Sequence, residues 1–528
     1  MRKRVREAIV EAPPVYNAVT ELLDRQAEGR LSGKLAYIDP ARALTYGALR
    51  SATCQLANLL ARLRIAAEAR AVMLMQDTAD FPVVFLGAIR AGVVPVPINT
   101  LLPAEQVLYV LNDTRAPVLF ISAPLLPALL ALLAQAPALR HIVVSGAEAA
   151  TPPQGVRLEQ ALAGEADTFE TAATHPDETA FMLYSSGSTG RPKGVRHRHT
   201  SLMATAQTYG AQVLGLRESD VCLSAAKLFF AYGLGNSLTF PLSVGATAIL
   251  VPERSTPAAM TAAMRAHRPT VFFGVPTLYG AMLAEPPAPD ATVSLRLCVS
   301  AGEALPEPIG AAWQARTGVE TIDGVGSTEL LHIFVSNRPG CVRYGTCGEA
   351  VPGYQLRLVD ETGTAVADGE IGELLVSGPS AADGYWNQRA KSVATFEGAW
   401  TRTGDRYYRD TDGRYIFCGR SDDMFKVSGI WVSPLEVEAA LLTHAAVLEA
   451  AVIAHDPGDG LLKPKAYVVL KGEAPHDRLT LALQDHVKAM TGPWKYPRWI
   501  DYLDALPKTA TGKIQRFKLR ERNSGAGA

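Results

Sequence analysis

Short apolar runs alternate with amphipathic stretches through the first third of the chain. From Thr45 onward, apolar residues recur at three- and four-residue steps, as in a helix with one buried face. The segments 71–75, 93–99, 118–121 and 142–145 are short apolar runs bounded by turn residues, which is typical of buried strands. This alternation of strands and helices predicts α/β architecture with parallel sheets.

Two later regions complete the predicted fold. Residues 123–139 form the longest apolar stretch, but prolines and a glutamine interrupt it, so it is too short and too broken to span a bilayer. We expect a core helix with a capping loop there. Near the end, Pro434 opens a helical pattern, and 450–454 and 465–470 have the pattern of strands. The chain is therefore predicted to be α/β, with a large N-terminal domain of sheets and helices and a small α+β C-terminal domain.

Composition adds few constraints. At 528 residues the chain is too long for one hydrophobic core. The net charge of −1 gives no indication of nucleic acid or an anionic membrane as a partner. The six cysteines include no C-x-x-C pair, which favours free thiols in a reducing, cytoplasmic compartment. Cys341 and Cys347 could pair or bind metal in principle, but no His/Cys cluster completes a site. The basic start lacks an apolar h-region, so no signal peptide is expected.

The most informative stretch is the segment 184–195, rich in Gly, Ser and Thr, which follows a buried-strand pattern at 179–183. Its glycines let the backbone approach a ligand, and consecutive N–H groups and hydroxyls can hold an anion. Lys193 adds a point charge suited to phosphate. The spacing fits neither a Walker A loop nor a Rossmann fingerprint. A flexible linker is the alternative, but a linker needs no preceding strand. The phosphate-binding candidates are Ser185, Ser186, Gly187, Ser188, Thr189, Gly190 and Lys193.

The segment 184–195 resembles the signature loop of the acyl-adenylate-forming superfamily, which comprises acyl- and aryl-CoA ligases, adenylation domains and luciferases. The resemblance extends from about Thr45 to Lys518. It implies ATP, Mg²⁺ and coenzyme A as substrates and cofactor, and a β-barrel-like subdomain within the large domain. It also implies a hinge at Asp422, with residues 1–421 binding adenylate and acyl group and residues 422–528 forming a mobile lid.

The resemblance also implies roles for single residues. Thr328 and Glu329 match residues that contact the α-phosphate and hold Mg²⁺. Asp405 matches a ribose-binding carboxylate, for which a turn-capping role is the alternative. Lys513 matches the catalytic lysine of the C-terminal motif, and Gly429 would line the channel for coenzyme A. Further nucleotide-binding candidates are Gly302, Glu303, Ala304, Asp323 and Arg420.

The acyl group is expected in an aromatic segment between Asp220 and Glu253. No Asp or Glu lies between these two residues, where amino-acid-activating relatives place an acid, so an amino acid substrate is disfavoured. Core packing is the alternative role for these aromatics, as it is for His332. The local sequence resembles aryl-CoA ligases of the benzoate type, which implies benzoate or a close aryl acid and a place in aromatic-acid degradation. The pocket candidates are Phe229, Phe230, Ala231, Tyr232, Gly324, Val325, Gly326, His332 and Ile333.

Several points stay open at this stage. Many relatives carry an aromatic where Val325 stands, so stacking on adenine must be weaker or replaced. Residues 196–199 precede a predicted helix, and a polar helix start is favoured over extra phosphate attraction. A ligase for a substituted benzoate or other small aryl acid is the nearest alternative. A non-ligase adenylate-binding or carrier-loading module is another, although the set Glu329, Asp405 and Lys513 weighs against a non-catalytic binder. The partners are small molecules, and the oligomeric state, a homodimer included, is open.

Overall fold

The computed structural model describes residues 12–146, 155–185, 192–421, 423–427, 430–458, 461–472, 474–492, 494–508 and 514–523. The contacts divide the chain into two units. The first comprises Met1–Leu356 and Val376–Arg402, and the second comprises Arg357–Leu375 and Thr403–Ala528. Asp422 lies outside the described residues, so the domain boundary at 421/422 stays a prediction. Within the described ranges, no helix has the length and apolar character needed to cross a membrane.

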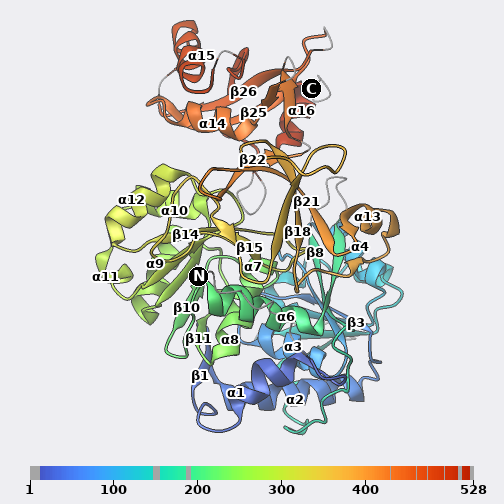
Figure 1. Ribbon diagram of the computed structural model, residues 1–528. Helices are drawn as coiled ribbons and strands as arrows, with labels where there is room; N and C mark the ends of the chain where they lie inside the picture. Colours follow the sequence, from blue (N-terminus) through green and yellow to red (C-terminus); the bar gives the residue numbers. More distant parts are fainter. Residues whose placement is uncertain are drawn as a thin grey trace, which may run out of the picture. The chain divides into compact units, whose positions relative to one another are not determined.

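The larger sheet of the first unit contains nine strands (Figure 1). They are β1 (Leu35–Ile38), β2 (Ala43–Thr45), β10 (Val221–Ser224), β11 (Thr247–Ile249), β12 (Val271–Gly274), β13 (Leu297–Ser300), β14 (Thr321–Gly326), β15 (Ile333–Ser336) and β16 (Glu349–Ala350). Their order is β16-β15-β14-β13-β12-β10-β11-β1-β2. The strands from β14 to β1 run parallel, and antiparallel strands complete both edges.

A second, five-stranded sheet is parallel throughout, in the order β4-β3-β5-β6-β7. Its strands are β3 (Arg70–Leu74), β4 (Val94–Pro97), β5 (Val118–Ser122), β6 (His141–Ser145) and β7 (Gly155–Arg157). The parallel α/β prediction is therefore confirmed, including the strands expected near 71–75, 93–99, 118–121 and 142–145.

Side-chain alternation along the strands places helices on both faces of this sheet. Ala71 and Met73 of β3 pack in the core that contains α2 (Tyr46–Arg62) and α3 (Asp80–Arg90), whereas Val72 and Leu74 pack on the other side with α4 (Ala104–Thr114). The outer face of the nine-stranded sheet is covered by α9 (Pro257–His267), α10 (Pro276–Ala284) and α12 (Glu307–Thr317) (Figure 1). Helix α2 begins as predicted, because the Thr45 hydroxyl accepts a hydrogen bond from the Ala48 N–H at 3.2 Å.

The predicted core helix at 123–139 is wrong. Only two short 3₁₀ turns, Ala123–Leu125 and Leu133–Gln135, form within this range. Pro124, Pro127 and Pro137 have no backbone N–H to donate, and each clashes with the preceding helical turn, so a continuous helix cannot form. The high apolar content therefore reflects burial of single side chains such as Leu126 and Leu129.

A third sheet of the first unit carries the residues on both sides of the signature loop. Its strands β8 (Thr179–Ser185), β9 (Lys193–Arg198) and β19 (Gly384–Tyr385) pair antiparallel in the order β19-β9-β8. The polar helix start predicted at 196–199 is wrong in part, because strand β9 continues to Arg198 and α6 (His199–Thr205) begins only at His199. His197 and His199 are both buried.

The second unit contains three groups of strands, of which the smallest is the antiparallel pair β23 (Phe425–Val427) and β24 (Ile430–Val432). The strands β17 (Gln355–Val359), β18 (Gly372–Ser377) and β21 (Trp400–Arg409) contribute most of their residues to it, and β22 (Tyr415–Arg420) pairs with β21. Further along the chain, β25 (Val447–His455), β26 (Lys463–Leu470) and β27 (Trp499–Tyr502) form a sheet that packs with α14 (Pro434–Leu442) and α15 (Asp477–Thr491). This α+β arrangement agrees with the prediction for the C-terminal region.

Candidate active site

Most predicted site residues of the first unit follow the carboxyl ends of neighbouring parallel strands. Strands β14, β13, β12 and β10 are adjacent and parallel, so their carboxyl ends meet at one edge of the sheet. The chain leaves this edge in the segments 225–232, 275–276, 301–304 and 327–329. Ligands bind at such edges of open α/β sheets. The fold therefore brings the predicted acyl-pocket and nucleotide segments side by side, although they are distant in sequence.

Two buried polar side chains lie side by side at this edge. Ser300 and Asp323 are register partners on β13 and β14. Asp323 Oδ2 accepts a hydrogen bond from the Leu305 N–H at 3.3 Å. Burial raises the pKa of Asp323 to about 8, against hydrogen bonds from Leu305, Gly324 and Ser300 that lower it. Next to them, Gly302 adopts φ of 94°, which a side chain would disfavour. Buried polar groups beside such a backbone turn fit a ligand with hydrogen-bonding edges, such as a nucleotide base.

A carboxylate cluster lies where the third sheet meets the end of β14. Lys193 Nζ donates hydrogen bonds to Glu329 Oε1 at 2.9 Å and to the Tyr385 hydroxyl at 2.8 Å. The Tyr385 hydroxyl in turn donates to Glu329 Oε1 at 2.8 Å. The three side chains therefore form a closed triangle of hydrogen bonds, of which only Lys193 and Glu329 belong to the predicted site.

Burial and charge act in opposite directions on this cluster. Burial alone would raise the pKa of the Glu329 carboxyl, but the Lys193 charge and the hydrogen bonds from Lys193 and Tyr385 outweigh it, so the pKa is lowered. Burial alone would lower the pKa of the Lys193 ammonium, but Glu329 and Tyr385 raise it above its ordinary value. Both groups are therefore charged at neutral pH.

Three consecutive carbonyls hold the turn that carries Glu329. The Thr328 carbonyl accepts a hydrogen bond from His197 Nε2 at 2.9 Å, the Glu329 carbonyl from the Ala382 N–H at 2.9 Å, and the Leu330 carbonyl from Ser380 Oγ at 2.7 Å. The next residue, Leu331, has φ of 64°, a conformation that is unfavourable for a side chain of its size. The surrounding hydrogen bonds thus maintain a strained turn at a predicted ligand site, as is common in active sites.

His197 is neutral at physiological pH. Burial lowers the pKa of its imidazole to about 4, and its ring stacks on Phe181 at 5.0 Å between centroids. Because the partner of Nε2 is a carbonyl oxygen, Nε2 carries the proton. His197 was expected either in a polar helix start or in phosphate attraction, and the structure shows instead that it donates a hydrogen bond to the Thr328 carbonyl. The position of His197 after the phosphate-binding segment did not predict this hydrogen bond.

The predicted acyl pocket is lined by aromatic rings around His332. Phe229 and Phe230 lie 4.6 Å apart between ring centroids, and the His332 ring lies 5.6 Å from that of Tyr232 and 4.5 Å from that of Phe240. Burial lowers the pKa of His332 to about 3, so the imidazole is neutral.

Glycines on β14 permit the close approach of the next segment. A Cβ added to Gly324 would lie 2.9 Å from Ile333 Cδ1, and one added to Gly326 would lie 2.6 Å from the His332 carbonyl oxygen. Side chains at these positions would displace the pocket residues that follow the turn. The structure therefore brings His332 next to Tyr232 and Gly326, and Ile333 next to Gly324. A single acyl pocket formed by all the candidates stays a prediction; they are Phe229, Phe230, Ala231, Tyr232, Gly324, Val325, Gly326, His332 and Ile333.

In the second unit, Asp405 and Arg420 are register partners across the β21–β22 hairpin. Arg420 Nη1 donates a hydrogen bond to Asp405 Oδ1 at 2.7 Å and to the Thr403 carbonyl at 3.2 Å. The Arg420 side chain keeps 51% of its exposure and that of Asp405 keeps 17%. Gly404, directly before Asp405, has φ of 70°, and a Cβ there would approach Arg420 Nη2 to 3.1 Å. The hairpin therefore holds both predicted ribose-binding residues next to each other.

The described residues fit a metal that is bound mainly through a substrate. No group of three or more His, Cys, Asp or Glu side chains within the described ranges could hold a metal ion. Glu329 offers a single carboxylate at the predicted phosphate site. Mg²⁺ is commonly bound in this way, by one or two carboxylates together with substrate phosphates and water. Of the predicted residues, Ser186, Gly187, Ser188, Thr189, Gly190, Asp422, Gly429 and Lys513 lie outside the described residues.

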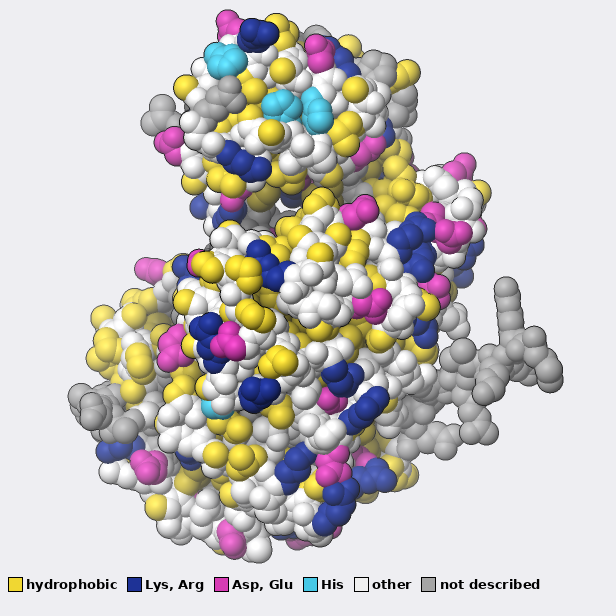
Figure 2. Space-filling view, turned by 90° about the vertical axis from the view of Figure 1, so that its left-hand side faces the viewer, with side chains coloured by type: hydrophobic (Ala, Val, Ile, Leu, Met, Phe, Trp, Pro, Cys, Tyr) yellow, Lys and Arg dark blue, Asp and Glu magenta, His cyan; other side chains and the backbone are white. Residues whose placement is uncertain are grey.

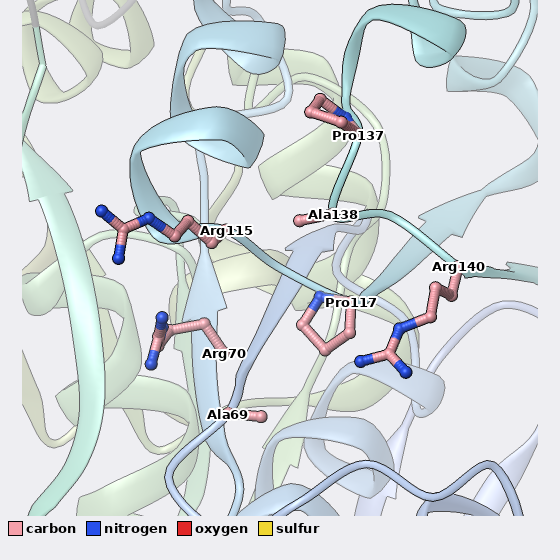
Figure 3. Close-up of a pocket in the computed structure, with 7 residues that line it drawn as sticks. All are labelled: Ala69, Arg70, Arg115, Pro117, Pro137, Ala138 and Arg140. Atoms are coloured by element: carbon pink, nitrogen blue, oxygen red, sulfur yellow. The ribbon is translucent and has the colours of Figure 1, made fainter.

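A surface hollow of about 290 Å³ lies away from these segments, at the opposite, amino edge of the five-stranded sheet. Arg70, Arg115 and Arg140 line it, and Figure 3 shows the first two with neighbouring guanidinium groups and Arg140 on the other side of Pro117. The Arg70 guanidinium lies 4.9 Å from the Trp386 ring centroid and donates to the Thr114 carbonyl. None of the predicted site residues lines this hollow. Elsewhere, over the described residues that Figure 2 shows, positive and negative side chains are intermixed.

Comparisons with known proteins agree over nearly the whole chain. Residues 23–386 match the family described as AMP-binding enzyme, and residues 436–513 match the AMP-binding enzyme C-terminal domain. The chain is 52% identical over 515 residues to the 4-hydroxybenzoate–CoA/benzoate–CoA ligase of Rhodopseudomonas palustris, which covers 97% of this chain and 95% of that protein. It is 52% identical over 516 residues to the benzoate–CoA ligase of Thauera aromatica, with 97% of each covered. A crystal structure of a benzoate CoA ligase from Burkholderia xenovorans superposes with a TM-score of 0.89 at 50% identity, covering 96% of this chain and 100% of the other.

Proposed function

The chain belongs to the family of AMP-binding enzymes, and on this premise we propose that its acid substrate is benzoate or a closely related aryl carboxylate. It is an ATP-dependent, AMP-forming acid–CoA ligase. The observation that carries the choice of acid is the 52% identity, over nearly the full length, to two proteins named as benzoate–CoA ligases. The ring of aromatic side chains around His332 supports it, because a flat apolar acyl group packs well against such rings.

The reaction proceeds in two steps. In the first, a carboxylate oxygen of the acid attacks the α-phosphorus of ATP in line, the bond to the bridging oxygen breaks, and pyrophosphate leaves. In the second, the thiol of coenzyme A attacks the carbonyl carbon of the acyl-adenylate. The thiol proton is lost, AMP leaves, and the thioester forms. Neither step requires a nucleophile from the protein, so catalysis depends on positioning and on stabilising the charge that develops on phosphate oxygens.

We assign the phosphate end of ATP to the residues of the first unit. Glu329 would hold Mg²⁺, which when bound neutralises charge on the phosphate oxygens. Thr328 would contact the α-phosphate from the turn held by His197. Lys193 would contact the phosphates through its ammonium group, together with the predicted loop residues Ser185 to Gly190. Asp323, on β14 beside Gly302, would accept a hydrogen bond from an amino group of the adenine.

Other assignments rest on motif position. Asp405, with its carboxylate oriented by Arg420, would accept hydrogen bonds from the ribose hydroxyls. In the first step, the Lys513 ammonium group would lie beside the substrate carboxylate and the α-phosphate. Gly429 would line the thiol channel in the second step. Rotation at Asp422 would remove Lys513 from the site and bring Gly429 to it. These three residues lie outside the described part of the chain, and their roles are proposals from the resemblance.

A hydroxylated benzoate is a second candidate, because one buried acceptor in the pocket has no partner. His332 Nε2 lies 3.3 Å from the Tyr232 carbonyl and 3.2 Å from Asn236 Oδ1, so Nε2 carries the proton. In the described residues, His332 Nδ1 is buried without a hydrogen bond. A hydroxyl group on the ring of the substrate could donate to this nitrogen.

The test is turnover of a panel of acids with ATP and coenzyme A, with acyl-CoA and AMP quantified by chromatography. We expect the highest kcat/KM for benzoate or 4-hydroxybenzoate. Fluorobenzoates should be accepted, because small changes of shape in an apolar pocket cost only about 1–3 kcal/mol. Acetate and hexadecanoate should be poor substrates. Hexadecanoate turnover as efficient as that of benzoate would overturn the aryl assignment. Accumulation of the adenylate without thioester would favour a carrier-loading module instead.

A further inference from the structure

The hydrogen-bond triangle at Glu329 contains a tyrosine that no motif assigned to the site. We infer that Tyr385 is a positioning residue whose hydroxyl anchors one carboxylate oxygen of Glu329, so that the other oxygen is presented to the metal of metal–ATP. The inference rests on the proposed function, in which Glu329 holds that metal. It adds a role for the short strand β19 in metal binding.

Strand pairing explains why Lys193 and Tyr385 meet. Tyr385 pairs with Val195 in the antiparallel register of β19 and β9. Directly opposite residues point to the same face of a sheet, and Lys193, two residues before Val195, shares that face. Lys193 Nζ accordingly lies 2.8 Å from the Tyr385 hydroxyl oxygen and 4.3 Å from the centroid of its ring. The backbone pairing therefore fixes the hydroxyl close to the ammonium group that pairs with Glu329.

The two oxygens of the Glu329 carboxylate differ in their hydrogen bonds. Glu329 Oε1 accepts hydrogen bonds from both Lys193 and Tyr385, at 2.9 and 2.8 Å. In the part of the chain that the structure describes, the hydrogen bonds from other residues go to Oε1, and the one further donor to the carboxylate is the N–H of Glu329 itself. One oxygen is thus anchored and the other keeps lone pairs for a metal. Partners of this kind orient a metal ligand and are worth about 10–100-fold in metal affinity.

The same short segment also fixes the backbone of Glu329. The Ala382 N–H donates to the Glu329 carbonyl at 2.9 Å, three residues before Tyr385. Main chain and side chain of Glu329 are therefore both held by residues 382–385. Without the Tyr385 hydroxyl, only the flexible Lys193 side chain would hold Oε1, and the carboxylate could rotate about its terminal torsion. A broader set of orientations would weaken metal binding without removing the ligand itself.

A packing role for Tyr385 can be separated from this positioning role. The Tyr385 ring lies 5.4 Å from that of Phe396 and is 5% exposed, so the ring contributes to a small core. The Tyr385→Phe variant keeps these ring contacts and removes only the hydroxyl. Tyr46→Phe is the matched control, because Tyr46 is fully buried in α2 and donates to the Ala246 carbonyl at 2.6 Å, outside the proposed site.

The experiment measures ATP binding by calorimetry over a range of Mg²⁺ concentrations, without acid or coenzyme A. For Tyr385→Phe we expect the Mg²⁺ concentration at half-saturation to rise about 10–100-fold. Tyr46→Phe should match the wild type. Thermal unfolding of the metal-free proteins reports on packing separately. In a Glu329→Gln background, Tyr385→Phe should have no further effect on the Mg²⁺ dependence, because the anchored ligand is already absent.

The outcomes separate this inference from the proposed function. Unchanged Mg²⁺ half-saturation in Tyr385→Phe overturns the positioning role, whether or not thermal stability falls. An equal effect of Tyr385→Phe in the Glu329→Gln background also overturns it, since the hydroxyl would then act through another group. The wild type could bind ATP in a Mg²⁺-dependent way and yet form no aryl thioester. That result would contradict the proposed acid substrate, while the titration would still decide the role of Tyr385.

Discussion

Two acid–base pairs among the predicted site residues, one in each unit, are built in different ways. Glu329 and Lys193, in the first unit, are 136 residues apart in sequence, and their side chains keep only 15% and 21% of their exposure. Asp405 and Arg420, in the second unit, are 15 residues apart and face each other across one hairpin, and the Arg420 side chain is 51% exposed. The same combination of charges is thus a product of tertiary folding in one unit and of local pairing in the other.

This difference has energetic consequences. A pair that is largely removed from water depends on its partner, because a single buried charge is left uncompensated when the other is removed. In the second pair the Asp405 side chain is only 17% exposed, but the Arg420 side chain is 51% exposed, so water and salt can reach the pair and weaken its charge interaction. The first pair should therefore couple function to the stability of the unit that carries it, whereas the second should affect ligand binding with little effect on folding.

The largest effect is expected from removing the charge of each carboxylate in turn. Glu329→Gln should lower the rate of ATP–pyrophosphate exchange about 10²–10³-fold, as for other preorganised groups that stabilise transition-state charge. Asp405→Asn should lower kcat/KM for ATP by about 10–100-fold, because a hydrogen bond to a charged group contributes about 1.5–3 kcal/mol. The amide keeps the side-chain shape in both variants. Equal losses would break the comparison, and unchanged metal dependence in Glu329→Gln would remove its assignment as the metal ligand.

The second prediction concerns folding. Lys193→Met should lower the free energy of unfolding by about 3 kcal/mol, at the low end for breaking a buried ion pair because some exposure remains. Arg420→Met should cost only about 1 kcal/mol, because the guanidinium is 51% exposed and water can replace it beside the Asp405 carboxylate. Urea denaturation of the ligand-free proteins, followed by circular dichroism, measures both. A loss for Arg420→Met as large as that for Lys193→Met would show that exposure does not distinguish the pairs.

The same difference decides what the sequence could predict. The parallel sheets and the helix from residue 46 depend on local patterns, and these predictions are confirmed. The hairpin that pairs Asp405 with Arg420 is also local, but motif positions indicated the two residues only separately. Motif positions also indicated Lys193 and Glu329 separately. The ion pair between them was not predicted, because its geometry depends on how β9 meets the end of β14, which no local pattern encodes.

Residues without a motif of their own were missed for the same reason. Tyr385 lies on the short strand β19, and only the pairing of β19 with β9 shows that its hydroxyl reaches Glu329. His197 was expected in a polar helix start and is instead a buried neutral donor to Thr328. The wrong helix at 123–139 has a different cause, since apolar content was given more weight there than the three prolines.

The smallest predicted effect is the pH dependence of the Lys193→Met penalty. In the wild type, the Lys193 charge and the hydrogen bonds from Lys193 and Tyr385 outweigh the effect of burial, so the pKa of Glu329 lies below its ordinary value of 4.5. Its contribution to stability is therefore present above pH 4.5 and is lost only as the pH falls through the lower folded value. The pKa of Lys193 is raised above 10.5, so its contribution is complete at neutral pH.

Removing Lys193 should reverse the direction of the pKa shift of Glu329. Burial, the largest influence on this carboxyl, then acts without the opposing charge and favours the protonated form, so protonation relieves the penalty. The difference in unfolding free energy between wild type and Lys193→Met should be greatest near pH 7 and should shrink as the pH approaches 4.5. Urea denaturation of both proteins at intervals from neutral pH down to this value measures it, with Arg420→Met expected to stay within about 1 kcal/mol throughout. A Lys193→Met penalty that is constant over this range would mean that Glu329 is not the charge that Lys193 compensates, and that the triangle with Tyr385 stabilises the unit through its hydrogen bonds alone.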